Sequence, residues 1–222
     1  MSVKVVAFDV YDTLARWPVG RVQPIEVQRL LGRFGIEISY QSFEAARQAV
    51  FFFDSPKREI VGWTDYLALV FARMGVMVPL DLLTCVAAEY ESRNNMEILP
   101  GALEAIEGAK RAGKVTCAFT TLPKFMIGLR KHELLSRLDH YFDASATGFG
   151  KGHPAFYRRI AEMLGVAPNE ILAVGDDPIC DVELPREAGW RAVLLSRDGS
   201  QSNDKITLSL KALSELPTYY SS

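Results

Sequence analysis

The chain has 222 residues, of which 49% are hydrophobic and 23% are charged, and this composition excludes a disordered chain and a fibrous repeat. The formal net charge of −2 gives no reason to expect a nucleic-acid or membrane-surface partner. We expect a cytoplasmic protein, because no apolar run approaches about 18 residues, the first residues lack a signal-peptide pattern, and the three cysteines have no CxxC spacing.

In chain order, the first predicted element is a strand at Val3–Val10, an apolar run that leads into turn-forming residues. The stretch 17–95 that follows has helical periodicity and no convincing strand. We expect breaks between its helices at Tyr40–Ser42 and Val78–Asp81. An all-helical insertion directly after the first strand is suited to cover a site at the strand ends.

Strands and helices alternate in the rest of the chain. Helices are predicted at Ala102–Ala112 and Pro154–Leu164, and each is followed by a glycine. The alternation indicates βαβ units and a parallel sheet, in which ligands bind at the carboxyl ends of the strands. Short apolar runs predict buried strands at Val115–Phe119, Ile171–Val174 and Arg191–Leu195, with a weaker one near Tyr141–Ala144.

These patterns divide the chain into two parts. We expect an α/β core with a three-layer, Rossmann-like parallel sheet, formed by residues 1–16 and 96–222, and an all-helical cap formed by residues 17–95. The residues after Ser196 are rich in serine, which predicts a loosely held tail. A homodimer through an apolar cap face and a monomer both stay open.

Four segments place polar side chains at predicted strand ends or in a loop before a helix. Each one alone has a plain structural explanation: a turn residue, a strand end, a solvated lysine, or an acidic loop that caps the next helix. The last segment carries three carboxylates within six residues, which repel one another unless a cation lies among them, and oxygen ligands favour Mg²⁺. The segments contain Asp9, Tyr11 and Asp12; Thr120 and Thr121; Lys151; and Asp176, Asp177 and Asp181.

The first segment also predicts which of its side chains face the same way. Side chains alternate between the two faces of a strand, so Asp9 and Tyr11 are expected on one side and Asp12 on the other.

In this order the four segments resemble the four motifs of the haloacid dehalogenase-like hydrolase superfamily. Leu99-Pro100-Gly101 before a helix, Tyr141-Phe142-Asp143, and Pro154 and Tyr157 after the lysine are also similar to that family. The helical insertion resembles the family's cap of the first type. The resemblance extends over nearly the whole chain and implies an enzyme with a parallel α/β core.

The resemblance implies a role for each matching catalytic residue. Asp9 would be the nucleophile that forms a covalent aspartyl intermediate. Thr120 would hydrogen-bond the phosphoryl or carboxylate oxygens of the substrate, and Lys151 would pair with Asp9 and with developing negative charge. Tyr11 lies two positions after Asp9, where family phosphatases carry the aspartate that acts as general acid and base.

A Mg²⁺ site is the second implication of the resemblance. Its ligands would be Asp9, the backbone carbonyl of Tyr11, and Asp176, while Asp181 would steady the loop or reach a metal-bound water. The further candidates for substrate binding are Thr13, Arg16, Thr120, Thr121 and Asp177.

Tyr11 leaves the type of reaction open. Tyrosine has a reference pKa near 10 and is a poor base at neutral pH, and a tyrosine at this position is similar to the metal-independent 2-haloacid dehalogenases. Those enzymes, however, lack the Gly-Asp-Asp loop and carry an asparagine where this chain has Thr121. We therefore expect a Mg²⁺-dependent hydrolase of a small phosphorylated metabolite that works through an aspartyl-phosphate on Asp9. A 2-haloacid dehalogenase and a non-catalytic binding or regulatory descendant remain as alternatives.

The cap contains residues that combine basic and aromatic character. They are candidates for substrate specificity, although packing of the aromatic rings inside the cap and solvation of the charges are the more common explanation of such residues. Trp17 lies closer to the expected cleft. The candidates in the cap are Arg47, Phe51–Phe53, Lys57, Arg58 and Trp63.

Overall fold

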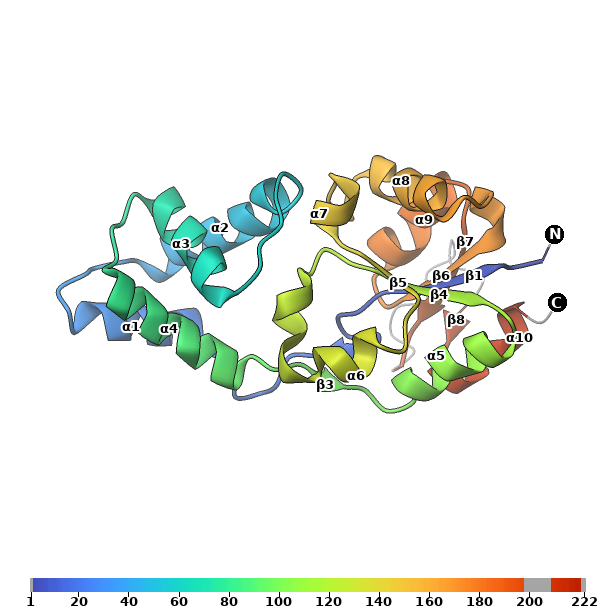
Figure 1. Ribbon diagram of the computed structural model, residues 1–222, viewed down its shortest axis with the longest axis horizontal. Helices are drawn as coiled ribbons and strands as arrows, with labels where there is room; N and C mark the ends of the chain where they lie inside the picture. The colour runs from blue at the N-terminus through green and yellow to red at the C-terminus, as the bar shows by residue number, and fades with distance from the viewer. Residues whose placement is uncertain (1, 198–208, 221–222) are drawn as a thin grey trace.

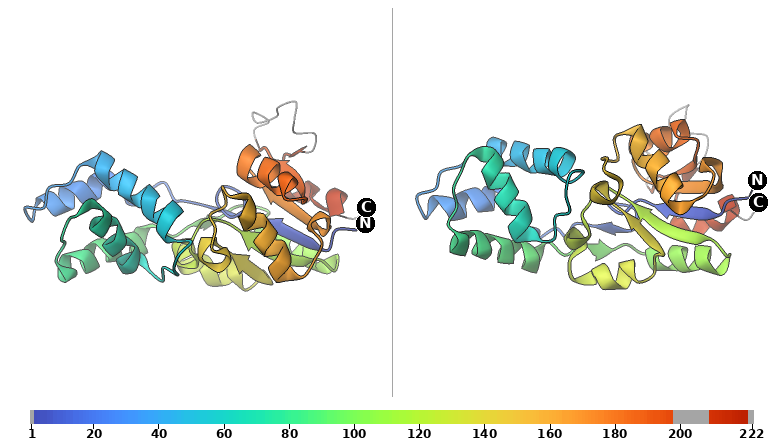
Figure 2. Two further views of the ribbon diagram at one scale, coloured as in Figure 1. Left: turned by 90° about the horizontal axis from the view of Figure 1, so that it is seen from above. Right: turned by 45° about the horizontal axis from the view of Figure 1, so that its top comes forward.

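The computed structural model describes residues 2–197 and 209–220 of the chain. An α/β part and a group of helices lie next to each other along the long axis of the molecule (Figure 1), and two further views show the same division (Figure 2). The described ends of the chain lie on the α/β part, at the end away from the helical group.

The α/β part is built on one six-stranded sheet with the order β5-β4-β1-β6-β7-β8. All of its neighbouring strands are parallel, and Phe8 lies level with Ala118 on one side and with Val174 on the other. This confirms the expected α/β fold with a Rossmann-like core. The strands are β1 (Val5–Phe8), β4 (Val115–Phe119), β5 (His140–Phe142), β6 (Ile171–Gly175), β7 (Arg191–Leu195) and β8 (Ser209–Leu210).

Helices cover both faces of the sheet, because alternate side chains of each strand point to opposite faces. Val6 and Phe8 of β1 belong to the same buried cluster as Ile106 of α5 (Ala102–Arg111), whereas Ala7 belongs to a second cluster with Phe156 of α8 (Pro154–Leu164). Strands buried on both faces read as continuous apolar runs, as observed here. The shorter core helices are α6 (Lys131–Leu135), α7 (Ala144–Thr147), α9 (Leu184–Glu187) and α10 (Pro217–Tyr220).

The helical group contains four α-helices and one π-helical turn, which continues the second helix. The expected helix breaks at Tyr40–Ser42 and Val78–Asp81 are wrong by a few residues, because helices already begin within both ranges. The Ser39 hydroxyl accepts a hydrogen bond from the backbone N–H of Ser42 at 3.0 Å and caps the helix that starts at Tyr40. The elements are α1 (Pro24–Gly32), α2 (Tyr40–Ala49), η1 (Val50–Asp54), α3 (Trp63–Met74) and α4 (Leu80–Arg93).

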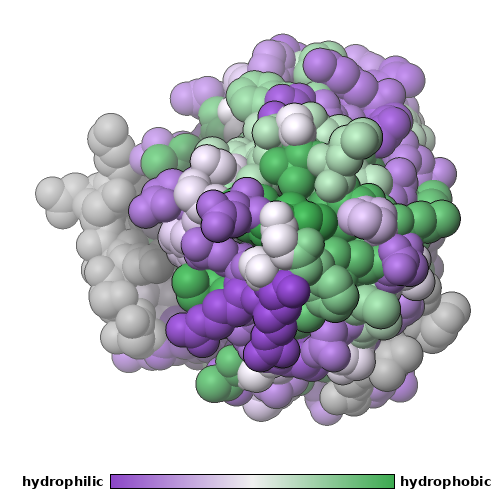
Figure 3. All heavy atoms as spheres, turned by 90° about the vertical axis from the view of Figure 1, so that its left-hand side faces the viewer, coloured by the Kyte–Doolittle hydropathy of each residue, from purple (hydrophilic) through white to green (hydrophobic). Residues whose placement is uncertain are grey.

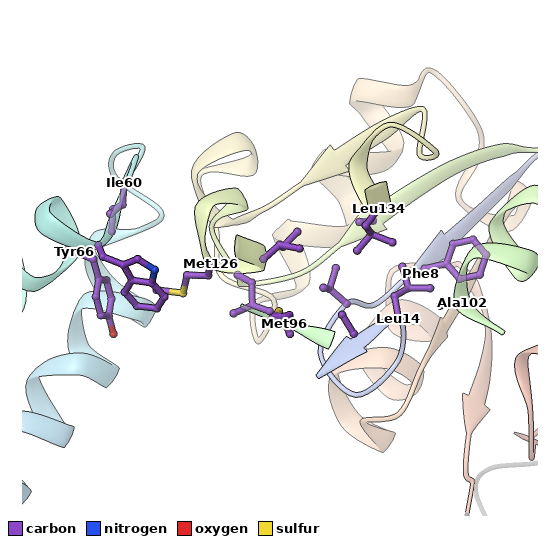
Figure 4. Close-up of a cluster of buried hydrophobic side chains, with 14 of the residues drawn as sticks. Phe8, Leu14, Ile60, Tyr66, Met96, Ala102, Met126 and Leu134 are labelled. Atoms are coloured by element: carbon purple, nitrogen blue, oxygen red, sulfur yellow. The ribbon is translucent and has the colours of Figure 1, made fainter. Parts of the chain in front are cut away.

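Two short strands, β2 (Ala15–Arg16) and β3 (Glu97–Ile98), pair antiparallel where the chain leaves the sheet for the helical group and where it returns. One buried hydrophobic cluster continues through this connection. Figure 4 shows its path from Ile60 and Tyr66 in the helical group through Met126 and Met96 to Leu14 and Phe8 near the sheet. The two parts of the molecule therefore share apolar packing.

The expectation of a loosely held tail after Ser196 is wrong for residues 209–220, and residues 198–208 lie outside the described residues. Leu210, Leu213, Leu216 and Tyr220 are buried in the cluster that covers one face of the sheet. Their apolar side chains hold this segment in place despite its serines.

The surface of the helical group carries several exposed apolar side chains, among them Phe34, Met77 and Leu80. Figure 3 looks onto this end of the molecule, where hydrophobic residues gather near the centre with hydrophilic residues around them. No helix in residues 2–197 and 209–220 is long and apolar enough to cross a membrane.

Candidate active site

A cleft of about 490 Å³ lies at the carboxyl ends of β1, β4 and β6. This is the edge of a parallel sheet at which ligands bind, and the helical group contributes part of its wall. The cleft is lined by Asp9, Tyr11, Thr120, Thr121, Lys151, Asp176, Asp177 and Asp181 from the predicted set, and by Trp17, Phe51, Phe52, Leu122, Gly152 and Cys180.

Asp9 directly follows β1, and its side chain is buried. Its backbone N–H donates to the carbonyl oxygen of Val174 at 2.8 Å, which fixes the residue against the end of β6. The chain then turns sharply, with Asp12 in the left-handed region at φ 54°, a conformation that aspartate tolerates better than most residues. Asp9 and Tyr11 both line the cleft, whereas Asp12 lines an adjacent depression and still lies close enough to Tyr11 to raise the pKa of its hydroxyl. The left-handed turn at Asp12, and not strand alternation, sets the direction of this side chain.

Lys151 reaches the cleft from the loop before α8 and is buried there. Its ammonium group forms ion pairs with the carboxylates of Asp9 and Asp181 and lies 4.4 Å from the centre of the Phe119 ring. Burial by itself would lower the pKa of Lys151, but Asp181 and Asp9 raise it above its ordinary value. The lysine therefore stays charged at neutral pH.

The loop after β6 brings two more carboxylates to Asp9. One oxygen each of Asp9, Asp176 and Asp181 lie within 4.8 Å of one another. The Thr13 hydroxyl donates to Asp176 at 3.2 Å, and the backbone N–H of Asp177 donates to Asp181 at 2.9 Å. These hydrogen bonds hold two of the three carboxylates in place before any ligand binds.

The three carboxylates share one cationic side chain, because Lys151 is the only lysine or arginine in the wall of the cleft among the residues that the structure describes. Burial first, and then the neighbouring carboxylates against the opposing charge of Lys151, raise the pKa of Asp9 to about 7. Burial and Asp181 raise the pKa of Asp176 to about 6. Burial is the largest cause of both shifts, and the neighbouring carboxylates add to it.

A divalent cation fits this arrangement. Carboxylate oxygens are the donors that Mg²⁺ prefers, usually from one or two side chains with water in the remaining positions. Asp9 and Asp176 would hold the ion, and Asp181 lies close enough to reach one of its waters.

Thr13, Arg16 and Asp177 were predicted to bind substrate, but the structure gives each of them another position or another bonding partner. Thr13 is fully buried behind Asp176 and does not line the cleft. Arg16 lines the separate depression that contains Asp12 and forms an ion pair with Glu97 at 3.5 Å. Asp177 borders the cleft, but its Oδ1 accepts hydrogen bonds from two backbone N–H groups at 2.8 Å, so it caps the turn that follows.

Two supporting contacts could not be predicted from the local sequence, although Tyr157 itself is one of the residues similar to the family. The Tyr157 hydroxyl lies 2.6 Å from the carbonyl oxygen of Lys151 and 2.5 Å from that of Cys180, so it ties the lysine loop to the loop after β6. The Arg197 guanidinium donates to the carbonyl oxygens of Asp12 and Thr13, which holds the turn after Asp9. Arg197 is separated from this turn by more than 180 residues, so only the fold could reveal the contact.

The family described as haloacid dehalogenase-like hydrolase matches residues 3–189. A Xenopus laevis protein named haloacid dehalogenase-like hydrolase domain-containing protein 3 is 23% identical over 216 residues, which cover 88% of this chain and 85% of that protein. The phosphoserine phosphatase of Thermus thermophilus is 32% identical over 115 residues, which cover 50% of this chain and 45% of the phosphatase.

The crystal structure of a 2-haloacid dehalogenase from Pseudomonas syringae superposes with a TM-score of 0.74 at 20% identity, over 97% of both chains. At this level of identity the likeness concerns the fold. The family match, by contrast, extends through all four segments that carry the polar residues of the cleft. The chain therefore belongs to the haloacid dehalogenase-like hydrolases, which confirms the resemblance seen in its sequence.

Proposed function

We propose that the protein is a Mg²⁺-dependent phosphohydrolase that removes phosphate from a small metabolite. The observation that carries this proposal is the group of three carboxylates around a single lysine, Asp9, Asp176 and Asp181 around Lys151. A site that attacks neutral carbon has no need for so much unneutralised negative charge, whereas a phosphohydrolase that binds Mg²⁺ uses it to hold the ion.

In the proposed reaction an oxygen of Asp9 attacks phosphorus, a bond forms between them, and the bond from phosphorus to the alcohol oxygen breaks. Water then attacks the aspartyl-phosphate and releases inorganic phosphate, which restores Asp9. Two anions at 4 Å repel each other by about 4 kcal/mol at an effective dielectric near 20. The charge of Lys151 offsets this repulsion, and Thr120 and Thr121 line the cleft where their hydroxyls can donate to phosphoryl oxygens. Mg²⁺, when bound, supplies further neutralisation of the phosphoryl charge.

Tyr11 lines the cleft. It has no carboxyl group that could protonate the leaving alcohol. Burial and then the neighbouring Asp12 raise the pKa of Tyr11 above its ordinary value, so its hydroxyl keeps its proton and does not act as a base at neutral pH. A general acid–base group is typically worth about 10²–10⁴-fold in rate. We therefore expect slow turnover of alkyl phosphates and faster turnover of aryl phosphates with good leaving groups.

The same position favours the second candidate, a metal-independent 2-haloacid dehalogenase, because halide leaves without a proton and needs no acid beside Asp9. A non-catalytic binding protein is a third possibility that Tyr11 leaves open. In either case we propose a small-molecule ligand, with no nucleic acid or membrane partner, for a cytoplasmic monomer or homodimer.

Hydrolysis of p-nitrophenyl phosphate by the purified protein tests the proposal. The assay is run with Mg²⁺ and with excess chelator, and with the variants Asp9→Asn and Asp81→Asn. Asp81 is the control, since it is an exposed aspartate of the helical group that lines neither the cleft nor the depression beside it.

We expect activity that requires the metal and Asp9 but survives in Asp81→Asn, and rates that fall steeply as the pKa of the leaving alcohol rises. Absence of activity with this activated ester contradicts the proposal. Halide release from 2-haloacids in the presence of chelator would then establish the dehalogenase, and ligand binding that Asp9→Asn leaves unchanged would establish a binding protein.

A further inference from the structure

A second cavity of about 300 Å³ lies inside the helical group, next to the cleft. Its walls combine aromatic rings, among them Trp63 and Tyr66 of α3, with three charged side chains, Arg21, Glu44 and Arg47. This volume lies at the lower end of the roughly 300–1,000 Å³ that small-molecule sites usually occupy, and the accessible surface of the walls is more polar than apolar.

The cavity and the cleft share three wall residues, Trp17, Phe51 and Leu122. These side chains come from the connection, the helical group and the loop after β4, so they stand where the two spaces meet. Arg21 belongs to the wall of the second cavity and also lies close enough to Tyr11 in the cleft to lower the pKa of that hydroxyl, against the larger effects of burial and Asp12. The second cavity therefore adjoins the cleft at these residues.

Arg47 lines this cavity and has one hydrogen-bond donor that is not used. Its Nη1 donates to Glu44 at 2.9 Å, while its Nε is buried and has no hydrogen-bond partner. Buried donors without partners are rare in proteins, because each one costs free energy. The Nε itself is enclosed, whereas 29% of the Arg47 side chain remains exposed and the residue lines the cavity. A ligand would therefore meet the accessible part of this side chain.

We propose that this second cavity binds the part of the substrate that is not phosphoryl, and that Arg47 selects a carboxylate there. The two arginines outnumber the single Glu44 carboxylate in its wall, so the net charge favours an anion. The planar edge of a guanidinium matches the two oxygens of a carboxylate, and the shared apolar residues suit a short carbon chain between the two ends. The substrate class is thus a phosphorylated carboxylic acid, and this identification of the phosphoryl end rests on the proposed function.

A series of non-hydrolysable ligands of increasing chain length tests the proposal through measurements of binding alone. Phosphonoacetate, phosphonopropionate, phosphonobutyrate and longer homologues are compared with alkylphosphonates of equal length by calorimetry at saturating Mg²⁺. The proteins are the wild type, Arg47→Met, Arg47→Lys and the control Arg33→Met, which removes an exposed arginine of the helical group that does not line the cavity. Thermal melting of each variant establishes that it is folded.

We expect one chain length at which the carboxylate tightens binding by about 10- to 100-fold, the range of a hydrogen bond to a charged group. The gain is lost in Arg47→Met, reduced in Arg47→Lys, and unchanged in Arg33→Met. Equal binding of both series at every length overturns the proposal, as does a gain that survives in folded Arg47→Met.

The same titrations separate this proposal from the proposed function. If the phosphonate end binds equally well without Mg²⁺ and in Asp9→Asn, the phosphohydrolase proposal fails. A carboxylate gain that depends on Arg47 under those conditions still supports the second cavity as a carboxylate site.

Discussion

The carboxylate of Asp9 is held in a position where its charge is costly. It is buried, and Lys151 must divide its single charge between Asp9 and Asp181. The pKa of Asp9, raised to about 7, lies close to the pH at which the residue must be ionised to attack a substrate. A metal ion that binds the ionised form would shift that balance towards the nucleophile.

This residue predicts how the stability of the metal-free protein depends on pH. A carboxyl group whose pKa is higher in the folded than in the unfolded chain destabilises the fold as it ionises. We expect the melting temperature of the wild type, relative to Asp9→Asn, to fall between about pH 4 and pH 7 as Asp9 (pKa about 7) and Asp176 (pKa about 6) ionise. Scanning fluorimetry with chelator measures the difference.

Addition of Mg²⁺ should reverse this trend, because the ion binds the ionised carboxylates and competes with protons. The stabilisation by Mg²⁺ is expected to be larger at pH 8 than at pH 5 and to be absent in Asp176→Asn. If the melting temperature of the wild type in chelator rises with pH relative to that of Asp9→Asn, the assigned shift is contradicted.

Thr13 acts on the site through Asp176. Its hydroxyl donates to that carboxylate at 3.2 Å, and loss of such a supporting hydrogen bond typically weakens metal binding or activity by about 10–100-fold. We expect Thr13→Val to raise the Mg²⁺ concentration needed for half-maximal activity, with a smaller effect on the rate at saturating metal.

The control for this variant is Thr116→Val, which removes another fully buried threonine hydroxyl, one that bonds Asp139 at 3.0 Å. It should leave the Mg²⁺ requirement unchanged. An equal Mg²⁺ requirement in both variants would argue against a role of Thr13 at the metal site.

At the scale of elements, the loop after β6 depends on one glycine. A Cβ atom on Gly175 would lie 2.7 Å from the Cβ atom of Asp181 and closer still to its carboxylate. Because Asp181 is fully buried, it has no open space to move into. Glycine is therefore required where the strand ends and the loop folds back.

We expect Gly175→Ala to lower the free energy of unfolding by about 1–3 kcal/mol through overpacking and to reduce activity by at least about 10-fold through displacement of Asp181. Gly108→Ala is the contrasting variant. Gly108 lies within α5, where an added Cβ finds its nearest atom at 3.7 Å, so this change should stabilise the protein by roughly 0.5–1 kcal/mol. Chemical denaturation and the phosphatase assay compare the two, and full activity in Gly175→Ala would show that the loop adapts.

At the scale of the whole molecule, one hydrophobic cluster runs from the helical group into the sheet (Figure 4). Met126 is buried within it and also borders the second cavity. Elements that share a core unfold together when their contacts are strong. The two parts should therefore melt in one transition.

Calorimetry should show a single peak, and fluorescence should give the same midpoint from Trp63 in the helical group and from Trp190 near the sheet, each observed with the other two tryptophans, Trp17 included, replaced by phenylalanine. Met126→Ala is expected to lower the free energy of unfolding by about 2–5 kcal/mol. Met163→Ala, at a position 47% exposed on α8, should change it little. Two separate midpoints in the wild type would contradict a shared core.

The sequence by itself determined the class of the fold and the order of its strands along the chain. Strands buried on both faces read as apolar runs, and the spacing of Asp9, Thr120, Lys151 and Asp176 is a property of the chain itself. Because the carboxyl ends of parallel strands meet at one edge, the meeting of these side chains followed from the strand assignment. The breaks within the helical group were displaced by a few residues, since hydrophobic periodicity does not locate a cap such as Ser39.

Only the tertiary structure decided which residues with suitable chemistry face the same space. Arg16 is the first basic residue after Asp9 in the sequence, yet β2 turns it into a separate depression, whereas Arg47 lines a cavity that adjoins the cleft. Arg197 reaches the turn after Asp9 from the far end of the chain. Local patterns record which face of its own element a side chain occupies. Burial, partners and pKa shifts depend instead on neighbours that are distant in sequence and that only the packing of the whole chain brings together.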